Sequence, residues 1–123
     1  MKFKMAHFNF NVKDLDASLA FYKEHLHMKE VRRSIAPDGS FIIVFLEDEY
    51  GTDFNLELTW LKNHTQAYDL GDEEFHLAFH VEDYDALRAE HKAKGLMAFD
   101  TEGKPYHFIV DPDGYWLEFM AMH

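Results

Sequence analysis

An internal repeat constrains the fold of this chain more than any other feature of its sequence. The segment His7–Ala17, HFNFNVKDLDA, resembles His76–Ala86, HLAFHVEDYDA, at a constant offset of 69 residues. Each copy ends in a similar apolar segment, Asn55–Leu58 in the first and Trp116–Phe119 in the second. These two segments are 61 residues apart, so the second copy has the shorter interior. Two copies of this length indicate a duplicated module rather than a solenoid.

Both copies predict the same order of elements, a strand, a helix and three strands. Residues 3–12 and 75–82 alternate apolar and polar side chains, which is the period of a half-buried strand. Asp14 and Asp83 stand where they can cap the helix that follows, and Gly95 suits the end of the second helix. The remaining strands are expected near 29–35, 41–48, 53–60, 97–100, 105–110 and 115–121.

The fold class that follows is α+β, with two βαβββ modules at about 1–62 and 73–123. We expect them to form a single domain over 1–123, with mostly antiparallel sheets curved around a metal site. The formal net charge of -11 argues against nucleic acid as a partner. No run approaches the ~20 apolar residues of a membrane span, so we expect no membrane association. The absence of cysteine excludes disulfides and Cys-ligated metal and is compatible with the cytoplasm, where we expect the protein.

Each module carries one His and one Glu at matched places. His7 and His76 open the first strands, and Glu57 and Glu118 lie between apolar neighbours in the last strands. All four are expected on the sheet face opposite the helix, where a pseudo-twofold axis would bring them together. Two imidazoles and two carboxylates suit a divalent ion such as Ni, Co, Zn, Mn or Fe(II).

A simpler interpretation competes with the metal site. A single His or Glu in such a place is more often an ordinary exposed residue, and a duplicated His can be inherited from an ancestor without function. Recurrence of both residue types in both modules, while many neighbours have diverged, favours the metal site.

Around these residues the chain resembles glyoxalase I (lactoylglutathione lyase) of the vicinal-oxygen-chelate superfamily. The resemblance covers essentially the whole chain. It rests on His7, on five motifs and on the full His, Glu, His, Glu set. The motifs are Val12-Lys-Asp-Leu15, Ser18-Leu-Ala-Phe-Tyr22, Leu56-Glu-Leu-Thr59, His76-Leu-Ala-Phe79 and Asp111-Pro-Asp-Gly-Tyr-Trp-Leu-Glu118.

The resemblance implies both an activity and roles for the residues. The metal ligands would be His7, Glu57, His76 and Glu118, holding one divalent ion per site, with Ni or Co favoured. The enzyme would isomerise the hemithioacetal of methylglyoxal and a thiol to a lactoyl thioester, which detoxifies methylglyoxal. Glu118 is then the expected catalytic base, with Glu57 as a second base or as a ligand only.

The chain departs from the family where the thiol is bound. Glyoxalase I enzymes often have Arg where this chain has Asn11 and Asn where it has Leu61. Arg32 and Lys104 match positions that face the carboxylates of glutathione, although both can also be ordinary surface charges. Because Asn11 carries no charge, we expect poor efficiency with glutathione or a preference for another thiol.

Two other classes of function stay open at this point. One is a different enzyme of the superfamily, a dioxygenase or an epimerase. The other is a non-catalytic module that binds a small molecule. The family builds each site from modules of two chains, so we also expect a homodimer, with the apolar final strand around Trp116, Phe119, Met120 and Met122 as the surface that needs cover.

Overall fold

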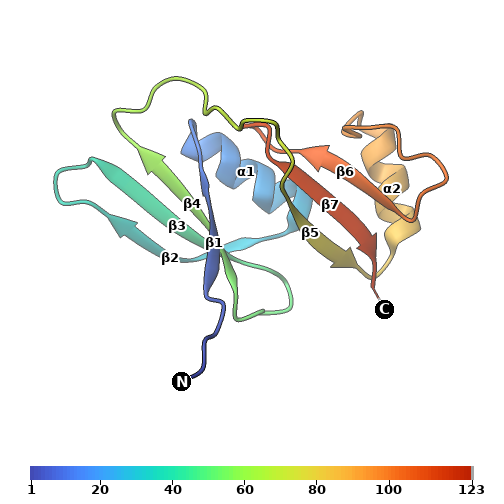
Figure 1. Ribbon diagram of the computed structural model, residues 1–123, viewed down its shortest axis with the longest axis horizontal. Coiled ribbons are helices and arrows are strands. Elements are labelled where there is room, and N and C mark those ends of the chain that lie inside the picture. Colours follow the sequence, from blue (N-terminus) through green and yellow to red (C-terminus); the bar gives the residue numbers. More distant parts are fainter. Residues whose placement is uncertain (123) are drawn as a thin grey trace. The chain divides into compact units, whose positions relative to one another are not determined.

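The structure is a computed structural model in which residues 1–122 are described. The chain forms two compact units, the first Met1–Tyr68 and the second from Asp69 onward. Figure 1 shows that each unit is a small sheet with one helix against it. No helix among residues 1–122 is both long enough and apolar enough to cross a membrane.

The first unit follows the predicted order of elements. These are β1 (His7–Asn11), α1 (Leu15–Leu26), β2 (Lys29–Ile35), β3 (Phe41–Glu47) and β4 (Asn55–Leu61). The strand order in the sheet is β1-β4-β3-β2, with β1 parallel to β4 and the other neighbours antiparallel. The first and last strands of the module, β1 and β4, are therefore direct neighbours.

Local signals explain where α1 begins and ends. The Asp14 side chain accepts a hydrogen bond from the Ala17 amide at 3.1 Å, which caps the first turn. Leu15 and Tyr22 are buried. The helix ends at His27, whose φ of 55° is left-handed. A non-glycine residue there is uncommon, and no sequence feature predicts it.

The core of the first unit lies on the helix side of the sheet. Phe10, Val44, Leu56 and Leu58 are all buried, at most 3% exposed. Because side chains alternate across a strand, the intervening residues point to the other face. That face carries Glu57 and the other polar residues considered below.

The second unit repeats this plan with one strand fewer. It contains β5 (His76–Val81), α2 (Tyr84–Ala93), β6 (Tyr106–Val110) and β7 (Trp116–Ala121). The strand order is β5-β7-β6, with β5 parallel to β7 and β6 antiparallel to it. Asp83 caps α2 through the Ala86 amide, and Gly95, at φ 70°, follows its C-cap as predicted.

Two predicted strand segments are wrong. Residues 97–100 form only an isolated bridge, Met97 to Ile109. After Ala98, whose amide donates to the Phe108 carbonyl, the chain turns away from β6. Residues 3–6 are also not a strand, since the ladder with β4 begins at His7 opposite Asn55 and the Ala6 carbonyl accepts only the Asn55 amide before it.

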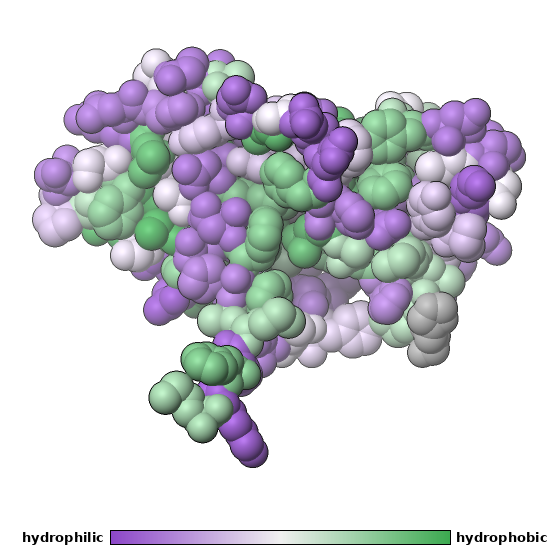
Figure 2. All heavy atoms as spheres, in the orientation of Figure 1, coloured by the Kyte–Doolittle hydropathy of each residue, from purple (hydrophilic) through white to green (hydrophobic). Residues whose placement is uncertain are grey.

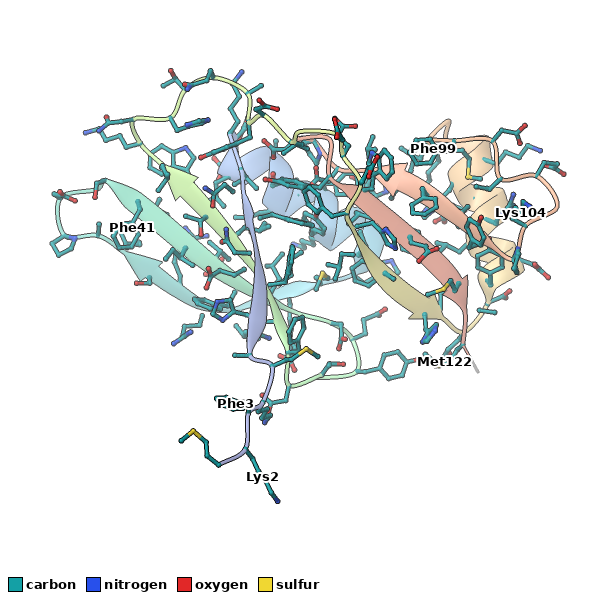
Figure 3. The ribbon with its side chains drawn as sticks, viewed as in Figure 1. Lys2, Phe3, Phe41, Phe99, Lys104 and Met122 are labelled. Atoms are coloured by element: carbon teal, nitrogen blue, oxygen red, sulfur yellow. The ribbon has the colours of Figure 1, made fainter. Side chains whose placement is uncertain are left out.

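The N-terminal segment keeps its alternating pattern without a sheet. Met1, Phe3 and Met5 are among the most exposed large apolar residues of the chain. Figure 2 shows this segment projecting as alternating hydrophobic and hydrophilic spheres, and Figure 3 shows Lys2 and Phe3 extending away from the first unit. An ion pair between Lys4 and Asp53 connects it to the loop before β4.

The second unit buries a pair of histidines that the sequence analysis did not predict. His91 on α2 and His107 on β6 are 0% exposed, and their Nδ1 and Nε2 atoms lie 2.8 Å apart. The Tyr84 hydroxyl lies 3.2 Å from the Nδ1 atom of His107. Burial, with His91 and Arg88 nearby, lowers the pKa of His107 to about 4. His107 is therefore neutral in the folded protein near pH 7.

Candidate functional site

The first unit brings its predicted His and Glu together. His7 begins β1, and Glu57 lies on β4 beside Asn9. The Nε2 atom of His7 is 3.4 Å from an Oε atom of Glu57. The two side chains are 45% and 13% exposed, so the imidazole faces solvent and the carboxylate is more enclosed.

The second unit repeats this pair with the same strand register. Glu118 on β7 lies beside Ala78 on β5, two residues after His76. The Nε2 atom of His76 is 3.3 Å from an Oε atom of Glu118. The pattern of exposure is also the same, 41% for His76 and 15% for Glu118. The duplication in sequence is thus a duplication of local geometry.

An aromatic ring supports each imidazole. Phe45 lies edge-on to His7 with ring centroids 5.9 Å apart, and Phe108 lies edge-on to His76 at 5.4 Å. Phe45 is directly opposite Glu57 in the sheet, and Phe108 is directly opposite Glu118. Each pair therefore lies against an apolar neighbour, which restricts the ring and lowers the local polarity.

The spacing within each pair fits two ligands of one ion. Ligand atoms about 2.1 Å from a metal and about 90–109° apart are separated by roughly 3.0–3.4 Å. The observed 3.4 and 3.3 Å match that separation. They exceed the ~2.7–2.9 Å of a good charge-assisted hydrogen bond. Among residues 1–122, no group of three or more His, Asp or Glu side chains lies close enough together to hold a metal ion.

The predicted thiol contact Asn11 belongs to a polar row that sequence analysis missed. The Asn9 side-chain Nδ2 donates to Oδ1 of Asn11 at 2.7 Å, and the Thr59 hydroxyl donates to Oδ1 of Asn9 at 2.5 Å. Asn9 and Asn11 alternate with buried Phe10, so they share the sheet face of His7. The row is uncharged.

The two predicted cationic contacts differ in position. The guanidinium carbon of Arg32 lies 4.0 Å from the ring centroid of Phe45, so Arg32 shares the face of the first His–Glu pair. Lys104 lies in the segment between α2 and β6, where its amide donates to the Thr101 carbonyl (Figure 3). Lys104 is four residues from Phe108, about 13 Å along an extended chain.

Comparison with known protein families places the fold. The Glyoxalase/Bleomycin resistance protein/Dioxygenase superfamily matches residues 4–119. The chain belongs to this superfamily. The resemblance that the sequence motifs carried is therefore confirmed, together with the α+β fold built from repeated modules.

Curated members of this superfamily that resemble the chain are named as lyases. A lactoylglutathione lyase of Neisseria meningitidis serogroup A is 35% identical, over 95% of this chain and 89% of the relative. A probable lactoylglutathione lyase of Synechocystis is 33% identical, over 93% of this chain and 92% of the relative.

Solved structures of the superfamily also resemble this chain. The trypanothione-dependent glyoxalase I of Leishmania major has a TM-score of 0.82 and 33% identity, covering 98% of this chain and 87% of the other. The fosfomycin resistance protein FosX of Listeria monocytogenes, at 20% identity and a TM-score of 0.72, shares the fold.

Proposed function

We propose that this protein is a lactoylglutathione lyase-like enzyme, of the glyoxalase I type, that detoxifies methylglyoxal. It converts the hemithioacetal of methylglyoxal and a small thiol into a lactoyl thioester. The observation that carries this proposal is the repeated His–Glu pair, with the same register and nearly the same spacing in both units. The likeness to lactoylglutathione lyases over most of the chain supports it.

One divalent ion is proposed per complete site, bound by His7, Glu57, His76 and Glu118. The spacing within each pair suits this donor set. Nickel or cobalt is the favoured ion, with zinc, manganese and iron as alternatives. When bound, the ion polarises the substrate oxygens and stabilises the negative charge that develops after proton removal.

The carboxylates supply the acid–base chemistry. Glu118 removes the proton from the hydroxyl-bearing carbon of the hemithioacetal and returns it to the neighbouring carbonyl carbon. The carbon-bound proton moves to the adjacent carbon and the hydroxyl proton moves to the adjacent oxygen, so the reaction needs no oxidant or reductant. Glu57 is equivalent in the first unit and serves as the base for the other configuration of the substrate.

The thiol part of the substrate is proposed to contact Asn11, Arg32 and Lys104. Arg32 lies over Phe45, the ring that is edge-on to His7. The uncharged Asn9–Asn11 row lies where the resemblance to glyoxalase I implies an Arg that binds a carboxylate. Recognition of glutathione is therefore expected to be weak at this end.

A homodimer with its sites between chains completes the proposal, and the cytoplasm remains the predicted location. The prediction that Phe119 is part of the apolar surface that needs cover is wrong. Phe119 is 3% exposed and packs on His91 and His107, so it belongs to the core of the second unit. Met122 is 41% exposed, and the N-terminal apolar residues add further uncovered surface.

Metal content of alanine variants tests the ligand set. Replacing His7, Glu57, His76 or Glu118 by Ala should lower bound nickel or cobalt, while His25→Ala, a surface histidine on α1, should keep it. Full metal content in all four variants contradicts the proposed ligands. Turnover of a catechol or a CoA ester in place of any hemithioacetal would identify a dioxygenase or an epimerase instead.

A further inference from the structure

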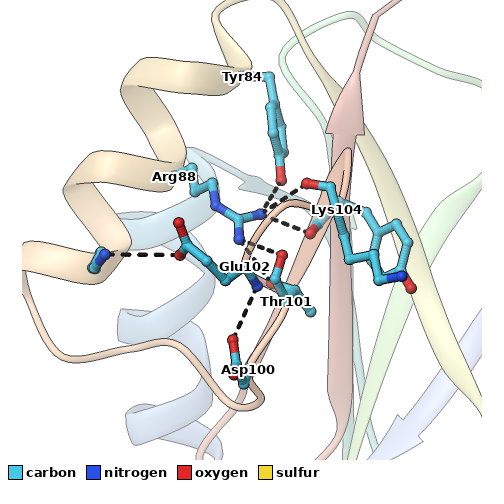
Figure 4. A network of polar contacts seen from close by, with 8 residues as sticks. Tyr84, Arg88, Asp100, Thr101, Glu102 and Lys104 are labelled. Carbon is cyan, nitrogen blue, oxygen red and sulfur yellow. Dashed lines mark hydrogen bonds and ion pairs between the residues drawn. The ribbon is translucent and has the colours of Figure 1, made fainter.

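Arg88 on α2 connects the helix to the segment that leads to β6. Its guanidinium donates to the Tyr84 hydroxyl at 2.8 Å and to the Tyr106 carbonyl at 2.8 Å. It also donates to the carbonyl and hydroxyl oxygens of Thr101, at 2.6 and 3.1 Å, and more weakly to the Lys104 carbonyl at 3.4 Å. Figure 4 shows the guanidinium surrounded by these acceptors. One side chain therefore bonds three successive parts of the segment.

This polar contact matters because apolar packing between the helix and the segment is incomplete. A cavity of about 230 Å³ lies between them, lined by α2 residues and by residues 97–102. The ion pair between Lys92 and Glu102 is 4.0 Å long, and both side chains are more than 70% exposed. Such a pair contributes little. Arg88 therefore supplies the short side-chain hydrogen bonds from α2 to the later part of the segment.

The same segment reaches the sheet face that carries the second His–Glu pair. The Phe99 ring lies 4.5 Å from the Trp116 ring and 5.4 Å from the Phe108 ring. Phe108 in turn lies edge-on to His76. Phe99 remains 38% exposed, so its ring can contact a ligand. A continuous set of contacts therefore runs from Arg88 through the segment to the aromatic rings beside His76.

We propose that Arg88 is a positioning residue that sets the size of the aldehyde substituent the site accepts. Its hydrogen bonds hold Thr101 and Tyr106, and the Ala98 amide donates to the Phe108 carbonyl, so Phe99 lies between two anchored points in an aromatic wall with Phe108 and Trp116. Because Phe108 lies edge-on to His76, this wall is the proposed contact for the side group of a 2-oxoaldehyde. This inference rests on the proposed function, because it assumes that the His–Glu pairs mark the reacting centre.

The guanidinium is suited to this role for a geometric reason. It is planar and offers several N–H groups in a fixed fork, so it can bond acceptors on several sides at once. A Lys at position 88 would keep the charge but not the fork. Arg88→Met keeps much of the apolar stem and removes every hydrogen bond. Lys92→Met is the matched control, one turn further along the same helix.

Hydrogen exchange tests the positioning directly. The Lys104 amide donates to the Thr101 carbonyl, which Arg88 also bonds. We expect this amide to exchange at least about tenfold faster in Arg88→Met, with the β5–β7 ladder unchanged, and at the wild-type rate in Lys92→Met. Unchanged exchange in Arg88→Met overturns the proposal, whether or not the protein is active.

The substrate preference supplies a readout that a purely structural role would not move. Methylglyoxal and phenylglyoxal hemithioacetals of one thiol are compared by their kcat/KM ratio. The ratio should shift toward the phenyl substrate by at least about threefold in Arg88→Met, since pocket size discriminates at this scale or more. It should stay constant in Lys92→Met. A constant ratio in an active Arg88→Met with full metal content contradicts the inference, whereas an inactive wild type contradicts the proposed function.

Discussion

The Glu118 carboxylate contacts His76 and lies opposite Phe108, and it remains partly exposed to solvent. It lies 3.3 Å from His76, with Phe108 directly across the strand, and is 15% exposed. A side chain in this state has few conformations to lose and can still contact a small substrate. Those are the geometric requirements for a base that removes and returns one proton.

Glu118→Gln tests this role by removing the base while keeping an oxygen ligand. We expect kcat for hemithioacetal isomerisation to fall about 10²–10⁴-fold, the range for loss of acid–base catalysis. Metal content should fall much less than in Glu118→Ala. Steady-state kinetics and metal analysis on the same preparation measure both. Wild-type kcat in this variant would exclude Glu118 as the base.

At Asn11, a substitution is expected to raise the activity with the glutathione substrate. Asn11→Arg restores a charge that can bond a carboxylate with two parallel hydrogen bonds. The kcat/KM for the glutathione hemithioacetal should rise about tenfold, whereas Asn11→Gln should not raise it. If the wild type already uses glutathione far better than any other thiol, the uncharged row does not determine specificity.

The internal repeat determined which individual site residues could be predicted from the sequence. His7 and His76 are predicted because the same residue type recurs at one offset. Asn9 and Arg88 were missed because the repeat places Ala78 and Leu19 at their equivalent positions, so nothing marks them. Their importance comes from hydrogen bonds formed only in the folded chain.

Among the elements, the contact between α2 and β6 contains the chain's buried titratable pair. His91, Tyr84 and Arg88 from α2 face His107, and Phe119 from β7 stacks on its ring. Burial, together with the positive charge that His91 and Arg88 place nearby, lowers the pKa of His107 from its ordinary 6.5 to about 4. Between about pH 4 and pH 6.5, His107 is therefore protonated in the unfolded chain and neutral in the folded chain.

This difference predicts how stability depends on pH. The contribution of His107 is complete above about pH 6.5 and is lost as the pH falls toward 4. At about 1.4 kcal/mol for each pH unit between the two pKa values, the loss totals roughly 3 kcal/mol. Urea unfolding of the metal-free protein at several pH values measures it. His107→Gln should flatten the pH dependence between 4.5 and 6, and an unchanged slope would contradict the low pKa.

The elements themselves were predictable where periodicity and capping agree. Asp14 and Asp83 cap α1 and α2 as the sequence indicated. At residues 97–100 the pairing with β6 is limited to the Met97 bridge and the Ala98 amide, and the chain then turns at Thr101, whose carbonyl accepts from the Lys104 amide. The left-handed His27 was also unpredictable, since no glycine marks the end of α1.

For the whole molecule, the exposed apolar residues favour association. Met1, Phe3, Met5 and Met122 are all exposed. Residues of this kind are commonly covered by a partner when they are contiguous. Light scattering at micromolar concentration should give twice the chain mass of 14.6 kDa. A monomer that nonetheless binds one metal ion and turns over substrate would contradict sites built between chains.

The proposal that this chain is a metal-dependent hemithioacetal isomerase is tested by titrating metal into the metal-free protein during the reaction. The protein is stripped with a chelator, and lactoyl thioester formation from methylglyoxal and several thiols is followed as Ni²⁺ or Co²⁺ is added. We expect no turnover without metal, and a rise in turnover that ends at one ion per chain. The absence of thioester with every thiol and with Ni, Co, Zn, Mn and Fe would contradict it.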